Sequence, residues 1–354
     1  MGFELLGHIL ALESGQNFST LIDNDIKGAM NMTDTSITVP AGANVVIPDK
    51  TARQAWDKSH GWTQASHGAY SSSANLSRFL SLILRGISSS SNAMSVPEQV
   101  LQDWLTWQTS TVTNGAYLGL AWETYRPLVQ SLNGGFPFSI HTKGGTVSPA
   151  YYSQIALVPE YGFGVVILTA RGPDTAPKRL LDSLIRMTSS FVEKKRSEHA
   201  RIRYAGTYRS VKETNSTASV LGLQLAEDGI CLQAMRWNYK ETNMLEKIRQ
   251  IWASSTPEGS SSFISRRNSS NSSDVRVCFQ PSGAPGEGDA WRAVINTPML
   301  VEKQSIFDGG CEEWRGTDSM YYGNEPMDLI RFTNSSAGDV ISVEIPWLRE
   351  TLFS

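Results

Sequence analysis

Residues 141–169 read HTKGGTVSPAYYSQIALVPEYGFGVVILT, and this stretch decides the fold of the first half of the chain. Its apolar runs at 151–158 and 163–169 are rich in β-branched and aromatic residues, with a turn bounded by Pro159 and Gly162 between them. Short runs of this kind predict antiparallel strands joined as hairpins. The same pattern predicts two more strands upstream, at 117–124 and 138–144.

Helical patterns flank these strands in the sequence. Polar residues from Ser72 onward precede a series of apolar positions that stops at Gly86, and a shorter helix is predicted after Pro97. Beyond the last strand, residues 176–198 carry leucines and isoleucines at helical spacing. The combination predicts an α+β first domain over residues 1–198, an antiparallel sheet with flanking helices.

The second half of the chain has a different pattern. From Arg203 onward we expect only short, evenly spaced strands, which is typical of a small β-barrel or sandwich. Residues 203–354 are therefore predicted to form an all-β C-terminal domain. A length of 354 residues also favours two domains over one.

Charge and hydropathy exclude some classes of partner. The formal net charge is −3, and the longest basic run is Lys194-Lys195-Arg196, so nucleic acid is not expected as a partner. No stretch approaches eighteen continuous apolar residues, so no membrane span is predicted. The five His residues and three Cys residues show no close ligand pairs, so no metal site is predicted either.

The cysteines and the glycosylation sequons bear on the compartment. Cys231, Cys278 and Cys311 are compatible with one disulfide and one free thiol, and equally with three buried reduced thiols. A high density of Asn-x-Ser/Thr sequons is typical of secretory-pathway surfaces. The candidate glycosylation sites are Asn17, Asn31, Asn75, Asn215, Asn268, Asn271 and Asn334. Secretion is favoured if a targeting segment lies upstream of Met1, and a cytoplasmic location otherwise.

Three ordered blocks carry a family resemblance. They are GFELLG at 2–7, GAYSSSANLSRFL at 68–80, and the stretch at 141–169. Together they resemble the serine hydrolases of the β-lactamase and penicillin-binding-protein type, in particular class C. Residues 1–198 look like a partial domain of that family, and the residues after 203 resemble a small β-rich domain appended to some members.

The resemblance implies acyl transfer by three converging elements. In this family a Ser-x-x-Lys pair supplies the nucleophile, a Tyr-x-Asn element handles a second proton, and a Lys-Thr/Ser-Gly element borders the oxyanion site. It implies hydrolysis or transfer at an ester or amide bond of a small-molecule or peptide substrate, without a cofactor.

The third element has a counterpart in this chain. Lys143-Gly144-Gly145 resembles Lys-Thr/Ser-Gly, with Gly144 in place of the usual hydroxyl residue. That difference removes one hydrogen-bonding group that would recognise a substrate carboxylate. Lys143, Gly144 and Gly145 are the predicted substrate-binding residues, and His141 is a further candidate to line the same cleft.

The other two elements are absent from their expected places. None of the Lys residues has a Ser three positions earlier, so no Ser-x-x-Lys pair exists. Tyr322-Gly323-Asn324 fits Tyr-x-Asn, but it lies in the second half and is predicted to be a loop turn. Ser73-Ala74-Asn75 fits Ser-x-Asn and is predicted to cap a helix.

These absences define the functional hypotheses. Because residues 2–7 resemble the helix that follows Tyr-x-Asn in the family, we expect the chain to be N-terminally truncated and inactive in this form, with no catalytic residue assigned. The complete protein would then be a serine hydrolase or acyltransferase. The alternatives are a non-catalytic binding or scaffold protein and a decayed gene remnant of the same family.

Overall fold

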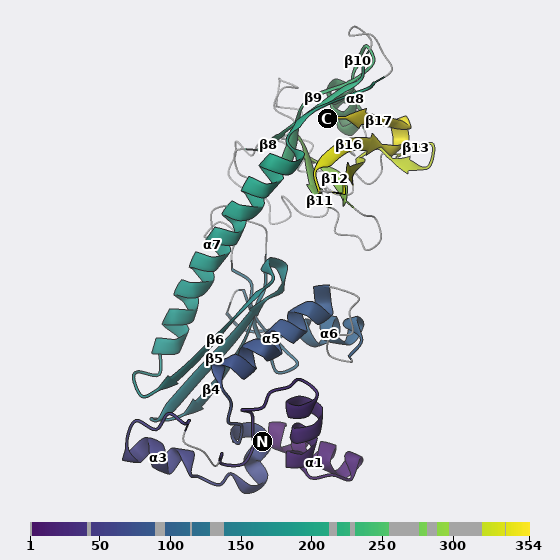
Figure 1. The fold of residues 1–354 in the computed structure, drawn as a ribbon. Coiled ribbons are helices and arrows are strands. Elements are labelled where there is room, and N and C mark those ends of the chain that lie inside the picture. The colour runs from purple at the N-terminus through teal and green to yellow at the C-terminus, as the bar shows by residue number, and fades with distance from the viewer. Residues whose placement is uncertain are drawn as a thin grey trace. The chain divides into compact units, whose positions relative to one another are not determined.

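The structure, a computed structural model, describes eleven segments of the chain. These are residues 2–40, 44–88, 96–113, 115–127, 138–211, 218–226, 231–254, 276–281, 289–296, 321–336 and 338–354. The chain divides into two compact units, Met1–Val192 and Glu193–Ser354 (Figure 1). The predicted domain limits, 1–198 and 203–354, remain predictions.

The first unit confirms the α+β class. Its helices are α1 (Gly2–Ser14), α2 (Phe18–Leu21), the π-helix Ile22–Gly28, α3 (Lys50–Trp56), α4 (Gln64–His67), α5 (Ser73–Ser88) and α6 (Glu98–Leu105), with 3-10 turns at Gly61–Thr63 and Pro159–Tyr161. Helix α7 (Ala176–Tyr204) begins in this unit and continues past its end at Val192. Helices α5 and α6 lie where they were predicted. Helix α7 is longer than predicted, because it continues through 199–204 without a break.

A six-stranded antiparallel sheet forms the centre of the first unit. In spatial order its strands are β1 (Trp107–Ser110), β2 (Ala116–Gly119), β3 (Glu123–Tyr125), β4 (Ile140–Val147), β5 (Tyr151–Val158) and β6 (Phe163–Ala170). The prediction of one strand at 117–124 is wrong. Ala121 adopts a positive φ of 70°, and the chain turns there so that β2 and β3 form a hairpin.

Helices pack on both faces of this sheet, because successive strand residues point to opposite sides. On one face, Ala156 and Ile167 pack with Leu181 and Ile185 of α7. On the other face, Leu157 packs with Leu80 and Ile83 of α5 and with the neighbouring aromatic side chains. Lys143 and its neighbours on β4 therefore belong to a strand that is held in place by two buried layers.

The second unit is an antiparallel β-structure that closes on itself. Its strands are β7 (Gly206–Arg209), β8 (Val220–Leu225), β9 (Leu232–Tyr239), β10 (Thr242–Asn243), β11 (Arg276–Pro281), β12 (Asp289–Asn296), β15 (Leu329–Asn334), β16 (Val340–Ile345) and β17 (Glu350–Phe353), with a separate hairpin of β13 (Tyr321–Tyr322) and β14 (Glu325–Pro326). Pairing of β8, at one end of the nine-stranded sheet, with β9, next to the other end, closes the sheet on itself and leaves the short β10 outside the closure. This barrel-like closure fulfils the prediction of a β-rich C-terminal domain.

A helix within this unit corrects the expectation of strands alone. Helix α8 (Met244–Ser254) follows β10, and the side chain of Asn243 accepts a hydrogen bond from the backbone N–H of Glu246 at its start. Leu245 and Ile248 are buried in the barrel core. The helix forms because Met244, Leu245 and Ile248 recur at helical spacing after a capping Asn.

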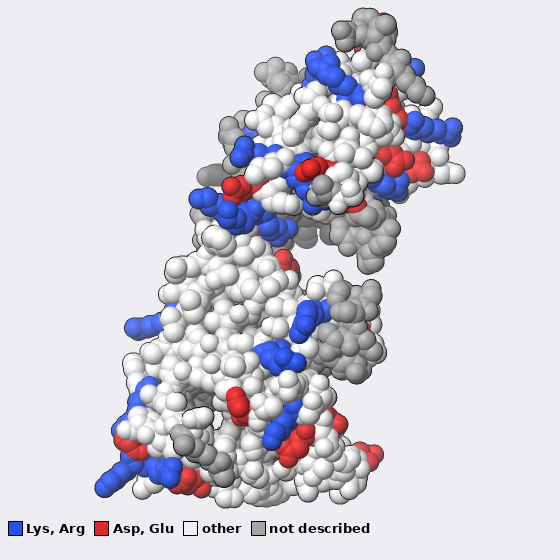
Figure 2. Space-filling view, in the orientation of Figure 1, with Lys and Arg blue, Asp and Glu red and all other residues white. Residues whose placement is uncertain are grey.

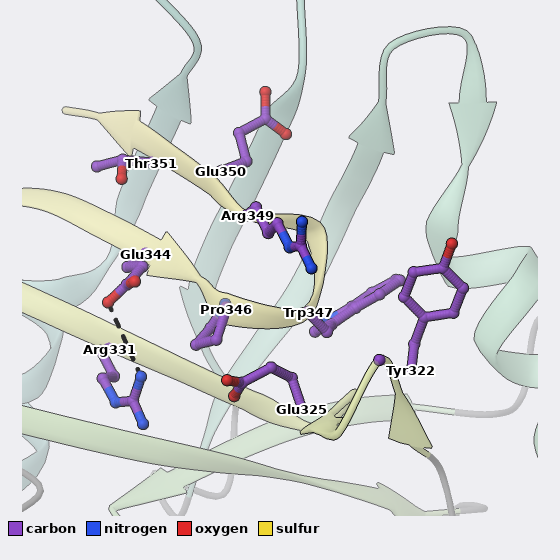
Figure 3. A pocket seen from close by; sticks show the side chains of 10 residues that line it. Tyr322, Glu325, Arg331, Glu344, Pro346, Trp347, Arg349, Glu350 and Thr351 are labelled. Atoms are coloured by element: carbon purple, nitrogen blue, oxygen red, sulfur yellow. Dashed lines mark ion pairs between the residues drawn. The ribbon is translucent and has the colours of Figure 1, made fainter.

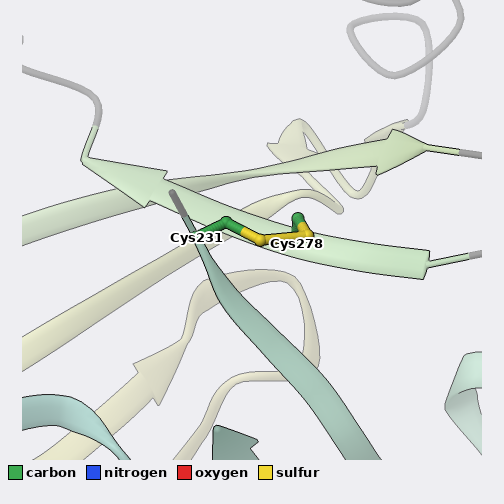
Figure 4. The surroundings of a disulfide bond; sticks show 2 residues. All are labelled: Cys231 and Cys278. Carbon is green, nitrogen blue, oxygen red and sulfur yellow. A yellow bond between two sulfur atoms is a disulfide. The ribbon is translucent and has the colours of Figure 1, made fainter. Parts of the chain in front are cut away.

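The structure contains a disulfide between Cys231 and Cys278, with Cα atoms 5.4 Å apart (Figure 4). It links the start of β9 to β11, where both cysteines are buried. Of the alternatives that the sequence left open, the structure therefore shows one disulfide. Cys311 lies outside the described residues.

Candidate functional site

Strand β4 changes its environment at Lys143. The neighbouring strand β3 pairs only with Ile140, His141 and Thr142, whereas β5 pairs with β4 from His141 to Val147. Over Lys143–Val147, no strand among the described residues occupies the β3 side of β4. Among the described residues, the backbone of this segment therefore has one edge bonded to β5 and one edge without a strand partner, which we call the open edge of β4.

The ammonium group of Lys143 lies at the beginning of this open edge. Its Nζ is 3.3 Å from Oε1 of Glu123 on β3 and donates to the carbonyl oxygen of Gly144 at 3.2 Å. The Lys143 side chain is 38% exposed, so the ion pair is partly solvated and contributes little to stability. Its main effect is to fix where the positive charge lies.

Gly144 and Gly145 leave space that their cross-strand partners use. A Cβ atom at Gly144 would lie 2.9 Å from Oε1 of Gln154, and one at Gly145 would lie 2.6 Å from Oγ of Ser153. Gln154 is buried, so its amide has little freedom to move aside. A serine or threonine at position 144, which the Lys-Thr/Ser-Gly element of the family has there, would compete with Gln154 for this space.

His141 is enclosed within the sheet. Its Nδ1 lies 3.0 Å from Oγ1 of Thr124, and the ring of Trp122 approaches it edge-on at a centroid distance of 6.3 Å. Burial lowers the pKa of His141 to about 4, so the imidazole is neutral near pH 7. His141 is only 6% exposed, whereas Lys143 and Gly144 are half-buried and Gly145 is exposed, so solvent reaches the predicted set only from Lys143 onward.

An aromatic cluster lies beyond the glycines, next to the last pair of β4 and β5, Val147 and Tyr151. The ring of Trp56 is 4.8 Å from that of Tyr70 and 5.9 Å from that of Tyr151. The Tyr70 hydroxyl donates to the carbonyl oxygen of Trp56, and burial raises the pKa of Tyr70. Sequence reasoning missed this cluster, because its members come from three separate segments.

The two remaining motif matches have structural roles. Gly323 and Asn324 both have positive φ and form the turn between β13 and β14, as predicted for Tyr322-Gly323-Asn324. The side chain that caps α5 is that of Ser72, one residue before the predicted Ser73-Ala74-Asn75, because its Oγ accepts from the backbone N–H of Asn75. The Asn75 Oδ1 in turn accepts from Asp34 and Thr35.

This arrangement also bears on the sequons. Asn75 is only 7% exposed and its amide is used inside the fold, so the structure argues against glycosylation there. Asn17, Asn31 and Asn334 are exposed. Asn215, Asn268 and Asn271 lie outside the described residues.

In the part of the chain that the structure describes, every helix is too short or too polar to cross a bilayer. The same residues contain no group of three His, Cys, Asp or Glu side chains that could hold a metal ion.

Comparison with known families defines the class of the chain. Residues 1–188 match the family model described as "Beta-lactamase", which is more than half of the 354 residues. Residues 196–354 match a second model, described as "Beta-lactamase-like-like, C-terminal domain". The chain therefore belongs to the β-lactamase family.

Particular relatives are similar over nearly the whole chain. A "Beta-lactamase-like protein" of Arthroderma benhamiae is 26% identical over 370 residues, covering 99% of this chain and 59% of the relative. A "Probable hydrolase clz13" of Cochliobolus lunatus is 22% identical over 361 residues, covering 99% and 54%. The chain thus spans less than two thirds of the length of either relative.

Solved structures of the same kind are also similar. A β-lactamase/D-alanine carboxypeptidase from Yersinia pestis has a TM-score of 0.41 at 19% identity, covering 54% of this chain and 53% of that one. An octameric penicillin-binding protein homologue from Pyrococcus abyssi has a TM-score of 0.42 at 16% identity, covering 84% and 60%.

Proposed function

We propose that these residues form part of a serine hydrolase or acyltransferase that acts on an ester or amide bond of a small molecule or peptide. The observation that carries this proposal is the open edge of β4, which begins at Lys143. Membership of the β-lactamase family supports it, as does the hydrolase name of one relative. In this proposal Lys143, Gly144 and Gly145 bind the substrate.

Each of these residues would act through a simple physical property. The Lys143 ammonium would attract a carboxylate or a carbonyl oxygen that gains negative charge in the reaction. The unpaired backbone of β4 would bind an extended substrate through main-chain hydrogen bonds. Gly144 and Gly145 lack side chains, so a substrate can approach the backbone closely there.

We further propose that these 354 residues alone form no acyl-enzyme. Covalent acyl transfer needs an activated nucleophile, and no Ser-x-x-Lys pair occurs anywhere in the sequence. Lys143 can bind or polarise an acyl group, but it cannot replace the missing serine and its base. Catalysis would require a nucleophile segment that these residues do not contain.

The test is mass spectrometry after incubation with a fluorophosphonate or an activated β-lactam. We expect no stoichiometric serine adduct on the 354-residue chain. A longer version of the protein that carries a Ser-x-x-Lys segment should be labelled at that serine. Stoichiometric labelling of any serine in the short chain would overturn the proposal, as would a longer version that is not labelled.

One observation favours a second candidate, a binding protein without catalysis. Two polar side chains of β4 are already engaged within the fold, Lys143 by Glu123 and His141 by Thr124. A non-catalytic protein would bind a peptide or β-lactam reversibly, and it would do so equally well in the short and longer forms. Equilibrium dialysis with an unreacted β-lactam would distinguish the two candidates.

We also propose that the chain folds in an oxidising compartment and is secreted and glycosylated. The Cys231–Cys278 disulfide supports this, because disulfides persist chiefly in secreted proteins. Peptide mapping of the native protein should recover the disulfide and glycans at Asn17, Asn31 or Asn334. Fully reduced, unglycosylated native protein would contradict the proposal.

A further inference from the structure

A cavity in the second unit is separate from the β4 segment described above. It has a volume of about 410 Å³ and lies among β13, β14, β15, β16, β17 and the Pro346–Leu348 turn (Figure 3). That volume is within the range of pockets that hold small ligands. Its lining combines aromatic rings with charged groups of both signs, which restricts the class of ligand.

Two tight turns build this cavity. Gly323 and Asn324, with φ of 59° and 67°, join β13 to β14 and set Tyr322 and Glu325 on either side of the hairpin. The Pro346–Leu348 turn ends at Arg349, whose φ is 53° and whose backbone N–H donates to the carbonyl oxygen of Pro346. A non-glycine residue in this left-handed region is strained, and such residues concentrate at ligand sites.

The cavity presents two aromatic rings. Trp347 is anchored in the barrel core and is only 7% exposed, whereas Tyr322 is 67% exposed at the hairpin. Their centroids are 6.5 Å apart with an interplanar angle of 72°. The exposed ring of Tyr322 can accept a third aromatic group, while Trp347 contributes only the small part of its ring that borders the cavity.

Some of the charged side chains that line the cavity form ion pairs with described residues and others do not. Arg331 and Glu344 form an ion pair at 4.0 Å. Within the part of the chain that the structure describes, neither the Arg349 guanidinium nor the Glu325 carboxylate has an ion-pair partner. Figure 3 shows these two side chains on either side of the Pro346–Trp347 segment, with the carboxylate of Glu350 pointing away from it.

We propose that this cavity binds a small zwitterion that carries an aromatic ring, of about the size of an aromatic amino acid. The ligand carboxylate would lie on Arg349, whose guanidinium matches a carboxylate in a two-hydrogen-bond geometry. Its ammonium group would lie on Glu325, and its ring would pack against Trp347 and Tyr322. An anion without an amine would meet the uncompensated Glu325 carboxylate and bind more weakly.

Calorimetric titration of the full 354-residue chain tests this assignment with three related probes. L-tryptophan carries the ring and both charges, indole-3-propionate lacks the amine, and tryptamine lacks the carboxylate. We expect saturable binding of tryptophan and at least about tenfold weaker binding of each of the other two, since each loses one charge-assisted contact. Absence of tryptophan binding, or equal binding of indole-3-propionate, would overturn the proposal.

Substitutions of cavity residues test whether tryptophan binds in this cavity. Arg349→Gly removes the guanidinium and also the left-handed strain, so we expect about tenfold weaker tryptophan binding with an unchanged or higher melting temperature. Glu325→Gln should weaken binding similarly. Arg236→Gln, at an exposed position on β9, is the matched control and should leave affinity unchanged. If Arg349→Gly retains full affinity, the ligand does not use this cavity.

Discussion

The Nζ of Lys143 lies 3.3 Å from Oε1 of Glu123, at the point where β3 stops pairing with β4. Glu123 is opposite Thr142 in the strand register, so its carboxylate reaches Lys143 diagonally. The ion pair therefore connects Glu123, the β3 residue of the last β3–β4 pair, to Lys143, the first β4 residue beyond that pairing. This contact fixes the position of the Lys143 ammonium group, which remains partly exposed to solvent.

Glu123→Gln should release the Lys143 side chain with little effect on folding. Both partners are more than a third exposed, so we expect the free energy of unfolding to change by less than about 1 kcal/mol. Peptide mass spectrometry can follow the rate at which an amine-specific reagent modifies Lys143. We expect this rate to be higher in the Glu123→Gln variant than in the unsubstituted protein. Glu198→Gln, which breaks the exposed pair with Lys195, is the control and should leave the Lys143 rate unchanged.

His141 should make the first unit less stable at acidic pH. Its folded pKa of about 4 lies below the ordinary value of 6.5, so the unfolded chain takes up a proton first as the pH falls. Stability is therefore fully present above pH 6.5 and decreases between pH 6.5 and about 4, by roughly 3 kcal/mol in total. Urea unfolding at pH 7.5 and 4.5 should show a smaller pH-dependent loss for His141→Gln than for the unsubstituted protein. An equal loss in both would contradict this assignment, and His8→Gln, at an exposed position, is the control.

Gly144→Ser should destabilise the first unit, because the new Cβ would meet the Gln154 amide at 2.9 Å. Overpacking of this kind costs about 1–3 kcal/mol. Removing the obstacle in the double variant Gly144→Ser/Gln154→Ala should recover part of the loss. The urea midpoints of the two single variants and the double variant form a cycle, and strict additivity would show that the two side chains do not compete.

Reducing the Cys231–Cys278 disulfide should destabilise the second unit. The bond closes a loop between positions 47 residues apart, and a crosslink of that span contributes about 2–4 kcal/mol. We expect a lower urea midpoint for the double variant Cys231→Ala/Cys278→Ala. Cys311→Ser is the matched control and should keep the midpoint of the oxidised protein. Identical midpoints for all three proteins would mean that the bond carries no stability.

Residues 203–354 should fold without residues 1–198, because the barrel closes on itself around its own core. The end of α7 belongs to that core, since Tyr204 is buried and its hydroxyl donates to Asp289 at 2.9 Å. A fragment that begins at Gly206 should therefore melt at a lower temperature than one that begins at Arg203. An unfolded 203–354 fragment would show that the predicted boundary is wrong.

The strand pattern predicted the centre of the first sheet well, because β5 and β6 are rich in apolar and aromatic residues and are separated by a turn bounded by Pro and Gly. It failed where the chain turns at Ala121, since apolar residues in a turn resemble a strand and nothing local predicts a positive φ at an alanine. Helix α8 was missed because it has only 11 residues and lies between strands β10 and β11, so its apolar positions are too few to establish a helical period.

The candidate site was predictable only in part. Lys143, Gly144 and Gly145 are contiguous, so a local motif identifies them. Glu123 and Gln154 could not be identified, because their contacts depend on the register between β3, β4 and β5. The cavity of the second unit could not be identified from the sequence either, because Tyr322 and Arg349 come to line the same cavity only in the folded barrel.

Strand β6 has a consequence for how the protein behaves in concentrated solution. Its eight residues pair with β5 along one edge, and none of the described residues pairs with the other edge. The run FGVVILTA contains no charge and no proline, the two features that usually discourage pairing between chains. If the purified chain self-associates, we expect strands of neighbouring molecules to pair along the free edge of β6. A single lysine introduced on that edge should then improve the solubility of the chain more than a change in the ionic strength of the buffer does.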